Sequence, residues 1–509
     1  MGLPTLTAAM AASLSDHGQK TALIFLRRGM PETTLTYGDL DHDANRCARA
    51  FRQLGVTKGE RVALFLNKSV FGVVAHLALY RIGAIAVPLN PGFKEAEMDY
   101  LLGDADPMLI LSEPEKRAML SSIAPHRRLE LVDTRKPYEE LDFFRSTPAD
   151  AVDSSIVPQD PALIIYTSGT TGNPKGAVLT QQNLVYDAQN VIKVWEIDTA
   201  DRLCHALPLF HVHGLCFALH TCLLAGAGVI LLDRFEAGTV LDVLTGKAEG
   251  LACTLFMAVP AMYTKLMDAM PDRPLDFNHI RLWTSGSAPL PDKDFARIER
   301  LFGKAPVERE GMSETGMNFS NPLHGPRIPG SIGLPLPGLQ VRVVAPDNLA
   351  DVAPGEIGEL WLKSPAITPG YWRKPRETAD TFVEGWFRSG DLGRVDPEGY
   401  YYLTDRIKHI IISGGENVSA KEVETVINLV DDVMESAVVG LPHEKWGEQV
   451  AAAVVTKPGS TLTVEQIQAF CRRQLHDWKC PRKIRFTAEI PRNTMGKVVK
   501  EEVKKLLQD

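Results

Sequence analysis

Cysteine is scarce in this sequence, and its spacing gives no sign of pairing. The 509 residues include 7 cysteines, and no two of them form a C-x-x-C pair. An odd, scattered set fits reduced thiols better than a disulfide framework or a zinc site. We therefore expect a cytoplasmic protein. The seven positions are Cys47, Cys204, Cys216, Cys222, Cys253, Cys471 and Cys480.

Targeting and membrane segments are also lacking. The opening residues MGLPTLTAAMAASLSDHGQK have neither a basic region nor a sustained apolar core, so they do not look like a signal peptide. The most apolar stretch, Gly214–Leu232, contains His220, Thr221 and a Gly-Ala-Gly break at 226–228. This pattern favours a buried helix, a tight turn and a buried strand at Val229–Leu232 over a membrane span. We expect no integral membrane segment.

Basic charge does not dominate. The formal net charge is −8, and no basic stripe or basic run with interleaved aromatic residues appears, which argues against a nucleic-acid partner. Hydrophobic residues make up 45% and charged residues 23%, which is typical of a soluble globular protein.

A chain of 509 residues is too long for one ordinary hydrophobic core, so we expect two or more domains. No feature of the sequence specifies an oligomeric state.

The first half of the chain alternates helix and strand patterns. A helix ends within Ala50–Leu54 and another spans Val70–Arg81, while Arg61–Leu66 and Ala84–Leu89 are typical of strands. This alternation predicts α/β layers built on parallel sheets.

The second half changes character after a region rich in proline and glycine, residues 321–338. We expect a more antiparallel region there, and then a helix that begins at a capping-box pattern formed by Ser419 and Glu422. We place the domain boundary near Asp405, between a large domain of layered α/β subdomains (1–404) and a small mobile α+β domain (405–509). The predicted strands are Leu339–Val344, Glu356–Lys363, Ser436–Leu441 and Ala451–Thr456.

A loop rich in glycine and hydroxyl groups lies at residues 166–176, YTSGTTGNPKG. It follows a short apolar run, 162–166, that is typical of a buried strand. Glycines let main-chain N–H groups approach a ligand closely, and Lys175 adds a positive charge. The P-loop pattern G-x-x-x-x-G-K-[ST] is not matched. A polyphosphate suits this loop better than the alternative, a flexible linker.

These residues also resemble the phosphate-binding signature of the adenylate-forming superfamily, which comprises acyl-CoA synthetases, nonribosomal peptide adenylation domains and firefly-type luciferases. A second matching segment is EREGMSET, residues 308–315. The resemblance implies that Glu314 helps hold Mg²⁺, an ion that prefers hard oxygen ligands and shares them with substrate phosphates. It also implies that Ser313 contacts phosphate. This chain has Glu310 where the family commonly has an aromatic residue that stacks on adenine.

Further segments match the family in its usual order. In RSGDLG, residues 388–393, Asp391 matches the aspartate that accepts hydrogen bonds from both ribose hydroxyls. Arg406 resembles an arginine that contacts the ribose, Lys408 falls at the hinge position, and His409 stands where the family often has an acidic residue. Taken alone, these residues would also fit a glycine turn and a solvated charged linker.

The segment PRNTMGK, residues 491–497, carries Lys497 at the position of the family's catalytic lysine. A lysine acting with Mg²⁺ offsets the negative charge that builds when a carboxylate attacks the α-phosphate of ATP. A surface lysine in a basic tail is the alternative. The sequence at Ser413, Gly414 and Gly415 resembles the turn that contacts the pantetheine arm of CoA in family members that use CoA. A simple turn is the alternative.

The acid pocket is predicted from less specific segments. His211 in FHVHG matches a position that borders the carboxylate, and a buried core histidine is the alternative. Met317 and Asn318 are expected to touch substrate. The segments HVHGL, SGSAPL, GMSETGMN and FSNP are most similar to the malonyl- and oxalyl-CoA synthetase branch. Lys265 stands where malonyl-activating relatives have a basic residue, usually an arginine that grips a carboxylate in bidentate fashion; a solvated helix residue is the alternative.

The resemblance thus implies an ATP-dependent acyl-CoA synthetase with ATP, Mg²⁺, CoA and a small carboxylic acid as its ligands, with malonate or another small dicarboxylate as one expectation for the acid. A fatty-acid or aryl-acid CoA ligase, a carrier-protein-loading enzyme and a nucleotide-binding pseudoenzyme are the alternatives. The nucleotide contacts that it implies are Thr167, Ser168, Gly169, Thr170, Thr171, Gly172, Lys175, Gly286, Ser287, Ala288, Glu310, Gly311, Met312, Ser313, Asp391, Arg406 and Lys497.

Overall fold

The structure is a computed structural model, which describes residues 4–152, 155–167, 173–247, 250–414, 416–492 and 498–508. The chain divides into two compact units. The first comprises Met1–Gln340 and Lys363–Phe387, and the second comprises Val341–Leu362 and Arg388–Asp509. The domain boundary expected near Asp405 falls inside the second unit and stays a prediction.

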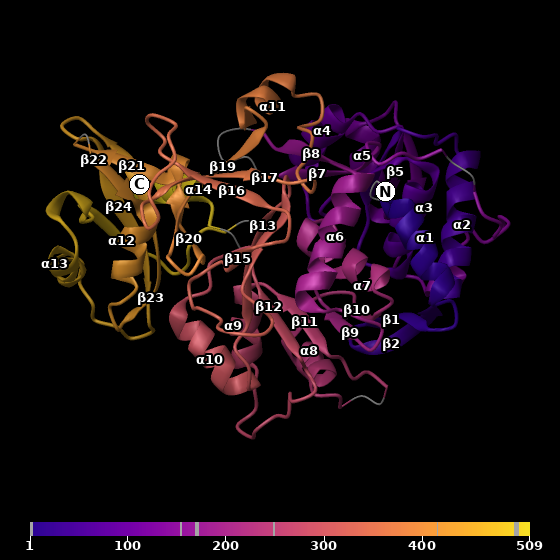
Figure 1. The fold of residues 1–509 in the computed structure, drawn as a ribbon, viewed down its shortest axis with the longest axis horizontal. Helices are drawn as coiled ribbons and strands as arrows, with labels where there is room; N and C mark the ends of the chain where they lie inside the picture. Colours follow the sequence, from indigo (N-terminus) through magenta and orange to yellow (C-terminus); the bar gives the residue numbers. More distant parts are fainter. Residues whose placement is uncertain are drawn as a thin grey trace. The chain divides into compact units, whose positions relative to one another are not determined.

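The first unit contains a nine-stranded sheet in the order β15-β14-β13-β12-β11-β9-β10-β1-β2 (Figure 1). Its central strands run parallel, whereas β2, β14 and β15 pair in antiparallel fashion at the two edges. The strands are β1 (Thr21–Arg27), β2 (Met30–Thr36), β9 (Arg202–His205), β10 (Gly228–Leu232), β11 (Leu255–Ala258), β12 (Leu282–Ser285), β13 (Val307–Met312), β14 (Gly316–Ser320) and β15 (Leu334–Pro335).

A second sheet of the same unit has six strands in the order β6-β5-β3-β4-β7-β8. All are parallel except β8, which forms an antiparallel hairpin with β7. This confirms the parallel α/β layers predicted for the first half of the chain. The strands are β3 (Arg61–Phe65), β4 (Ile85–Pro88), β5 (Leu109–Ser112), β6 (Arg128–Leu131), β7 (Pro161–Thr167) and β8 (Lys175–Thr180).

Helices cover these sheets, and their ends follow local sequence signals. Helix α3 (Val70–Ile82) begins at Ser69, whose hydroxyl accepts the N–H of Gly72, and ends at Gly83 in the left-handed region (φ 69°). The other helices of this unit are α1 (Leu6–Asp16), α2 (Tyr37–Gln53), α4 (Glu95–Ala105), α5 (Arg117–Ile123), α6 (Gln181–Trp195), α7 (Thr221–Leu224), α8 (Ala237–Leu244), α9 (Pro260–Asp268), α10 (Asp292–Phe302) and α11 (Pro375–Thr381), with a π-helical segment at His213–His220.

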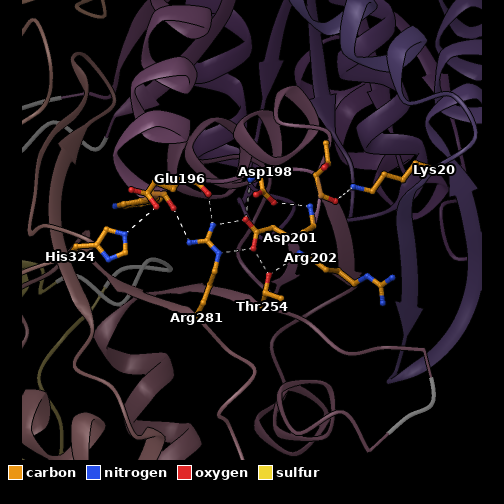
Figure 2. A network of polar contacts seen from close by, with 11 residues as sticks. Lys20, Glu196, Asp198, Asp201, Arg202, Thr254, Arg281 and His324 are labelled. Carbon is orange, nitrogen blue, oxygen red and sulfur yellow. Dashed lines mark hydrogen bonds and ion pairs between the residues drawn. The ribbon is translucent and has the colours of Figure 1, made fainter.

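An ion-pair network fixes the amino ends of three parallel strands in the nine-stranded sheet (Figure 2). The buried carboxylate of Asp201, next to the start of β9, accepts the Thr254 hydroxyl (2.7 Å) just before β11. It also accepts Nε of Arg281 (2.8 Å), just before β12. Because parallel strands share one direction, the opposite, carboxyl ends of β9, β11 and β12 are thereby held at a common edge, where ligands bind in sheets of this kind.

The second unit contains antiparallel strands, as expected for this half of the chain. Strands β16, β17, β19 and β20 form one sheet, and the other has the order β22-β21-β24-β23 with β25 parallel to β24. The elements are β16 (Gln340–Val344), β17 (Gly358–Lys363), β19 (Trp386–Val395), β20 (Tyr401–Arg406), β21 (Ile410–Ser413), β22 (Glu416–Ser419), α12 (Ala420–Ile427), β23 (Val433–His443), β24 (Gly447–Thr456), α13 (Val464–Gln474), β25 (Lys483–Phe486) and α14 (Lys500–Gln508). Strand β18 (Phe382–Val383) pairs with the first residues of β19 within the first unit.

The capping box expected at the start of α12 is half formed. The Ser419 hydroxyl accepts the N–H of Glu422 (3.2 Å), as predicted. The Glu422 carboxylate, however, binds Nζ of Lys479 (2.7 Å) instead of turning back to the helix cap. A full-charge partner attracts this carboxylate more strongly than a backbone amide does, so the expected reciprocal bond was wrong.

No helix in the described part of the chain is long and apolar enough to cross a membrane. The stretch Gly214–Leu232 forms the expected buried helix, turn and strand. All seven cysteines are buried and free.

Four buried histidines of the first unit are held neutral. Burial lowers the pKa of His76 to about 4 and the pKa values of His205 and His220 to about 3, and it also lowers the pKa of His213. Both ring nitrogens of His220 lack a hydrogen-bond partner among the described residues. Its ring packs edge-on against Tyr80, with 5.5 Å between centroids.

We expect the protein to lose stability as the pH falls below about 6.5, the ordinary pKa of histidine. Below this pH, the histidines of the unfolded chain bind protons that the buried histidines of the folded chain do not bind. This difference lowers the free energy of unfolding by about 2 kcal/mol per buried histidine at pH 5. Substitution His220→Phe should therefore reduce the difference between the free energies of unfolding measured in urea at pH 7.5 and pH 5. The exposed His126 provides the control, His126→Gln. An unchanged pH dependence in His220→Phe would contradict this account.

Candidate active site

The phosphate-binding loop predicted from YTSGTTGNPKG joins β7 to β8. Thr167 ends β7 and lies opposite Lys175, the first residue of β8, and the Thr167 hydroxyl donates to the Lys175 carbonyl (3.3 Å). The hairpin thus fixes both ends of the loop on a buried pair of strands. Ser168, Gly169, Thr170, Thr171 and Gly172 lie outside the described residues.

Glu314 lies in the turn between β13 and β14. The turn depends on Gly316 in the left-handed region (φ 74°), where a Cβ would come within 2.6 Å of the Asp187 carboxylate. That carboxylate accepts the Met317 N–H (2.8 Å), and the Glu314 carbonyl accepts the Thr368 N–H (2.7 Å). Burial raises the pKa of Asp187 to about 7. Hydrogen bonds to the main chain of Glu314 and of Met317 therefore hold the turn.

Tyr371 brings Lys175 and Glu314 to one place. Its hydroxyl donates to Oε1 of Glu314 (3.1 Å), and Nζ of Lys175 lies 5.1 Å from the centroid of its ring. Oε2 of Glu314 has no hydrogen-bond partner within the described ranges, so a hard carboxylate oxygen is available to a cation. This donor fits magnesium, which usually takes one or two protein carboxylates and completes its shell with phosphates and water. The described residues contain no cluster of three or more His, Cys, Asp or Glu that could hold a metal.

A buried arginine, Arg309, lies on β13 beside this turn. Its side chain is 3% exposed, and none of its three guanidinium nitrogens has a hydrogen-bond partner in the part of the chain that is described. It lies over the Phe217 ring (5.1 Å), and a Cβ at Gly286 would come within 2.7 Å of it. Burial lowers the pKa of Arg309 to about 10, so the group keeps its charge at pH 7. A buried charge without hydrogen bonds is costly unless a ligand supplies them.

The segment after β12 lies against Arg309 and the π-helix. Gly286 packs on the guanidinium, and Ser287, with a strained φ of 69°, places its hydroxyl 3.3 Å from Nδ1 of His213. Ala288, by contrast, is exposed. His211, expected beside the substrate carboxylate, is half-buried, and its ring contacts Phe210 (4.5 Å between centroids). Its substrate contact stays a prediction.

Glu310, Met317 and Asn318 were predicted to line the nucleotide or acid site. The Asn318 amide donates to Oε2 of Glu310 (3.0 Å) and to the Thr315 hydroxyl (2.7 Å), while its own Oδ1 lacks a partner among the described residues. Met317 is buried beneath the turn. The carboxylate at the usual position of an adenine-stacking residue is therefore tied into a polar chain on the β13–β14 hairpin. Gly311 and Met312 belong to β13, and Ser313 follows it.

Lys265, expected to contact a second substrate carboxylate, is exposed on α9. That role stays a prediction.

In the second unit, the predicted ribose contacts Asp391 and Arg406 pair with each other across β19 and β20. Nε of Arg406 lies 2.5 Å from Oδ1 of Asp391, and its Nη2 donates to Oδ2 (3.3 Å). The preceding Arg388 is bound by the buried Glu359, which also accepts the N–H of Gly390 (3.1 Å). Glu359 thus fixes the turn that precedes Asp391.

The residues predicted to form the hinge and to contact CoA also lie in this unit. Lys408 is exposed in a 3₁₀ turn, and the adjacent His409 has its pKa lowered to about 4, mainly by burial. Ser413 is buried, and the Gly414 N–H donates to the Trp446 carbonyl (2.8 Å). Gly415 and Lys497 lie outside the described residues.

Two cations lie over the Trp446 ring next to this turn. Nζ of Lys445 is 4.5 Å and the guanidinium carbon of Arg482 is 4.7 Å from the ring centroid. Both side chains therefore place positive charge beside the Ser413–Gly414 segment.

Sequence reasoning did not assign roles to Arg309, Tyr371 or Trp446. Arg309 lies inside the quoted segment EREGMSET, and an arginine in the middle of a buried strand was the available signal. Tyr371 stands in GYWRKP, where nothing in the local pattern distinguishes it from an ordinary turn tyrosine.

Known proteins resemble this chain over most of its length. Residues 10–372 match the family described as AMP-binding enzyme, and residues 422–497 match the AMP-binding enzyme C-terminal domain. A feruloyl-CoA synthase of Amycolatopsis sp is 35% identical over 93% of this chain and 94% of its own length. The mitochondrial malonate–CoA ligase ACSF3 of Bos taurus is 34% identical over 92% of this chain and 86% of its own length.

A solved structure agrees with both the fold and the sequence match. The crystal structure of ATP-bound MatB from Rhodopseudomonas palustris superposes with a TM-score of 0.92 at 35% identity, covering 99% of each chain. The chain therefore belongs to the AMP-binding enzyme family, the adenylate-forming superfamily, and falls in its acyl-CoA synthetase branch.

Proposed function

We propose that the protein is an ATP-dependent acid–CoA ligase that works in two steps. The substrate carboxylate attacks the α-phosphorus of ATP, and pyrophosphate leaves to give an acyl-adenylate. The thiol of CoA, having lost its proton, then attacks the acyl carbon, and AMP leaves as the thioester forms. The observation that carries this proposal is the meeting of Lys175 and Glu314 around Tyr371, because it gathers a phosphate-binding cation and a metal-binding carboxylate.

Each residue has a separate task in the first step. Lys175 holds the departing phosphates by charge, and Glu314 would hold Mg²⁺, which neutralises phosphate charge when bound. Asp391 and Arg406 bind the ribose, and Lys497 stabilises the negative charge that develops around the α-phosphate. These groups mainly position the reactants and stabilise charge, with little acid–base chemistry required.

The CoA step is assigned to the second unit. The Ser413–Gly414 turn lets the backbone approach the pantetheine arm, and Lys445 and Arg482 beside Trp446 offer positive charge to the phosphates of CoA. We assign Lys408 to the hinge, the position about which the small C-terminal domain rotates between the two steps in this family.

We propose a small acid with a second anionic group as the substrate. Arg309 supports this, since a buried guanidinium without hydrogen bonds is suited to a bidentate contact with a carboxylate. Malonate fits this requirement, and the similarity to the malonate–CoA ligase of Bos taurus supports it. The feruloyl-CoA synthase relative indicates how varied the acids of this branch are, so the preference for a dianion rests on Arg309.

The free, buried cysteines support a reducing compartment, and we propose the cytoplasm.

Replacing the catalytic lysine should separate the two steps. We expect Lys497→Ala to lower carboxylate-dependent ATP–pyrophosphate exchange about a hundredfold or more, because one electrostatic contact to the transition state is lost. Thioester formation from a supplied acyl-adenylate should be largely spared. Lys504→Ala, in the same basic tail, is the control and should change neither step. Equal losses in the two steps would contradict a role confined to adenylation.

Replacing Arg309 should change the choice of acid. We expect Arg309→Met to lower kcat/KM for malonate at least a hundredfold, since breaking a buried charged contact costs about 3 kcal/mol or more, while short monocarboxylates gain relative to malonate. The measurement is CoA-dependent AMP release over a panel of malonate, short fatty acids and an aryl acid. Lys265→Met is the matched comparison. Loss of malonate use in Lys265→Met but not in Arg309→Met would transfer the role to Lys265.

The cations beside Trp446 should affect CoA alone. We expect Arg482→Ala to raise KM for CoA by about ten- to a hundredfold, the worth of a charge-assisted hydrogen bond, with ATP–pyrophosphate exchange unchanged. Arg473→Ala removes a similar arginine that lies over Phe470 (5.4 Å) and serves as the control. An unchanged KM for CoA in Arg482→Ala would remove this residue from the CoA site.

A further inference from the structure

Tyr371 makes two different contacts with two different predicted site residues. Its hydroxyl donates to Oε1 of Glu314 at 3.1 Å, and its ring faces Nζ of Lys175 at 5.1 Å from the centroid. The first contact is a charge-assisted hydrogen bond and the second a cation–π interaction. One side chain therefore acts on both the metal-binding carboxylate and the phosphate-binding cation.

The backbone around Tyr371 is fixed independently of these contacts. The Trp372 N–H donates to the Gly176 carbonyl (2.7 Å), and Tyr371 forms a bridge with Ala177, so this segment runs along β8. The Tyr371 N–H donates to the Thr378 hydroxyl (2.9 Å) at α11. Because the main chain is held at these points, removing the hydroxyl alone should leave the ring in place.

The hydroxyl is well suited to orient Glu314. A phenolic hydroxyl carries its proton near neutral pH, and that of Tyr371 donates it to Oε1 of Glu314. A carboxylate that accepts one hydrogen bond at Oε1 loses rotational freedom and presents Oε2 in a defined direction. Hydrogen bonds of this kind to metal-ligating carboxylates commonly change metal affinity by 10- to 100-fold.

We propose that Tyr371 is a positioning residue, whose hydroxyl orients Glu314 for magnesium and whose ring places Lys175 against the phosphates of ATP. This inference rests on the proposed function, because it assigns Tyr371 to the same nucleotide site. The two contacts can be separated by substitution. Tyr371→Phe removes the hydroxyl and keeps the ring, whereas Tyr371→Leu removes both.

The first experiment measures ATP–pyrophosphate exchange as a function of Mg²⁺ concentration. We expect Tyr371→Phe to raise the Mg²⁺ concentration for half-maximal exchange by about 10- to 100-fold, with exchange recovering at saturating Mg²⁺. Tyr371→Leu should in addition raise the KM for MgATP when Mg²⁺ is saturating, since Lys175 loses its ring. Thioester formation from a supplied acyl-adenylate should stay unchanged in both variants.

The control is Tyr402→Phe, which deletes a similar bond from a tyrosine hydroxyl to the Asp396 carboxylate (2.9 Å) in the second unit. It should leave the Mg²⁺ requirement unchanged. A purely structural role of Tyr371 would lower the thermal midpoint and both half-reactions together, without a selective change in Mg²⁺ dependence. That result, or the same Mg²⁺ requirement in Tyr371→Phe as in the unmodified protein, would overturn the proposal.

A second measurement does not depend on turnover. Calorimetric titration with ATP at several Mg²⁺ concentrations reports how strongly the metal strengthens nucleotide binding, and Tyr371→Phe should shift this dependence to higher Mg²⁺. If the unmodified protein showed no exchange with any acid, the proposed function would fail. The calorimetric shift would still test Tyr371: its presence would support the positioning role, and its absence would refute it.

Discussion

The hydrogen bonds of one short segment, residues 368–372, link the two sheets of the first unit at the candidate site. The Thr368 N–H binds the Glu314 carbonyl next to the nine-stranded sheet, and the Trp372 N–H binds the Gly176 carbonyl in the six-stranded sheet. Two hairpins that lie far apart in the sequence are thereby fixed to the same stretch of backbone. Lys175 and Glu314 can meet around one tyrosine because the main chain, rather than flexible side chains, sets their separation.

Burial then determines which groups near the site carry charge. His205 and His213 are neutral because burial disfavours their protonated forms, whereas Arg309 keeps its charge because its ordinary pKa is so high. Arg309 therefore keeps a positive charge near the neutral imidazole of His213. That charge favours an anionic ligand, and the buried histidines contribute to acid sensitivity, since protonating them requires opening the structure.

The strands, helices and their parallel or antiparallel pairing could be predicted because each depends on local periodicity and turn residues, as the agreement at β3, α3 and β4 illustrates. The reciprocal bond of the capping box was predicted wrongly because a distant lysine, Lys479, competes for the Glu422 carboxylate. Arg309 and Tyr371 were not assigned for a similar reason: their significance lies in contacts with residues remote in sequence. The role of a motif residue can be predicted from the motif itself, but the partner that orients this residue is known only from the fold.

The acids near Arg309 explain why its guanidinium remains available to a ligand. Asp187 and Glu310 both favour its charged form by electrostatic attraction. Yet the Asp187 carboxylate accepts the Met317 N–H, and Oε2 of Glu310 accepts the Asn318 amide, so both acids serve the β13–β14 hairpin. The charge of Arg309 is thus partly compensated at a distance, while its N–H groups find no acceptor among the described residues. A substrate carboxylate would supply both a negative charge and hydrogen-bond acceptors to Arg309. The fold tolerates the buried cation because Asp187 and Glu310 already offset part of the free-energy cost of burying its charge.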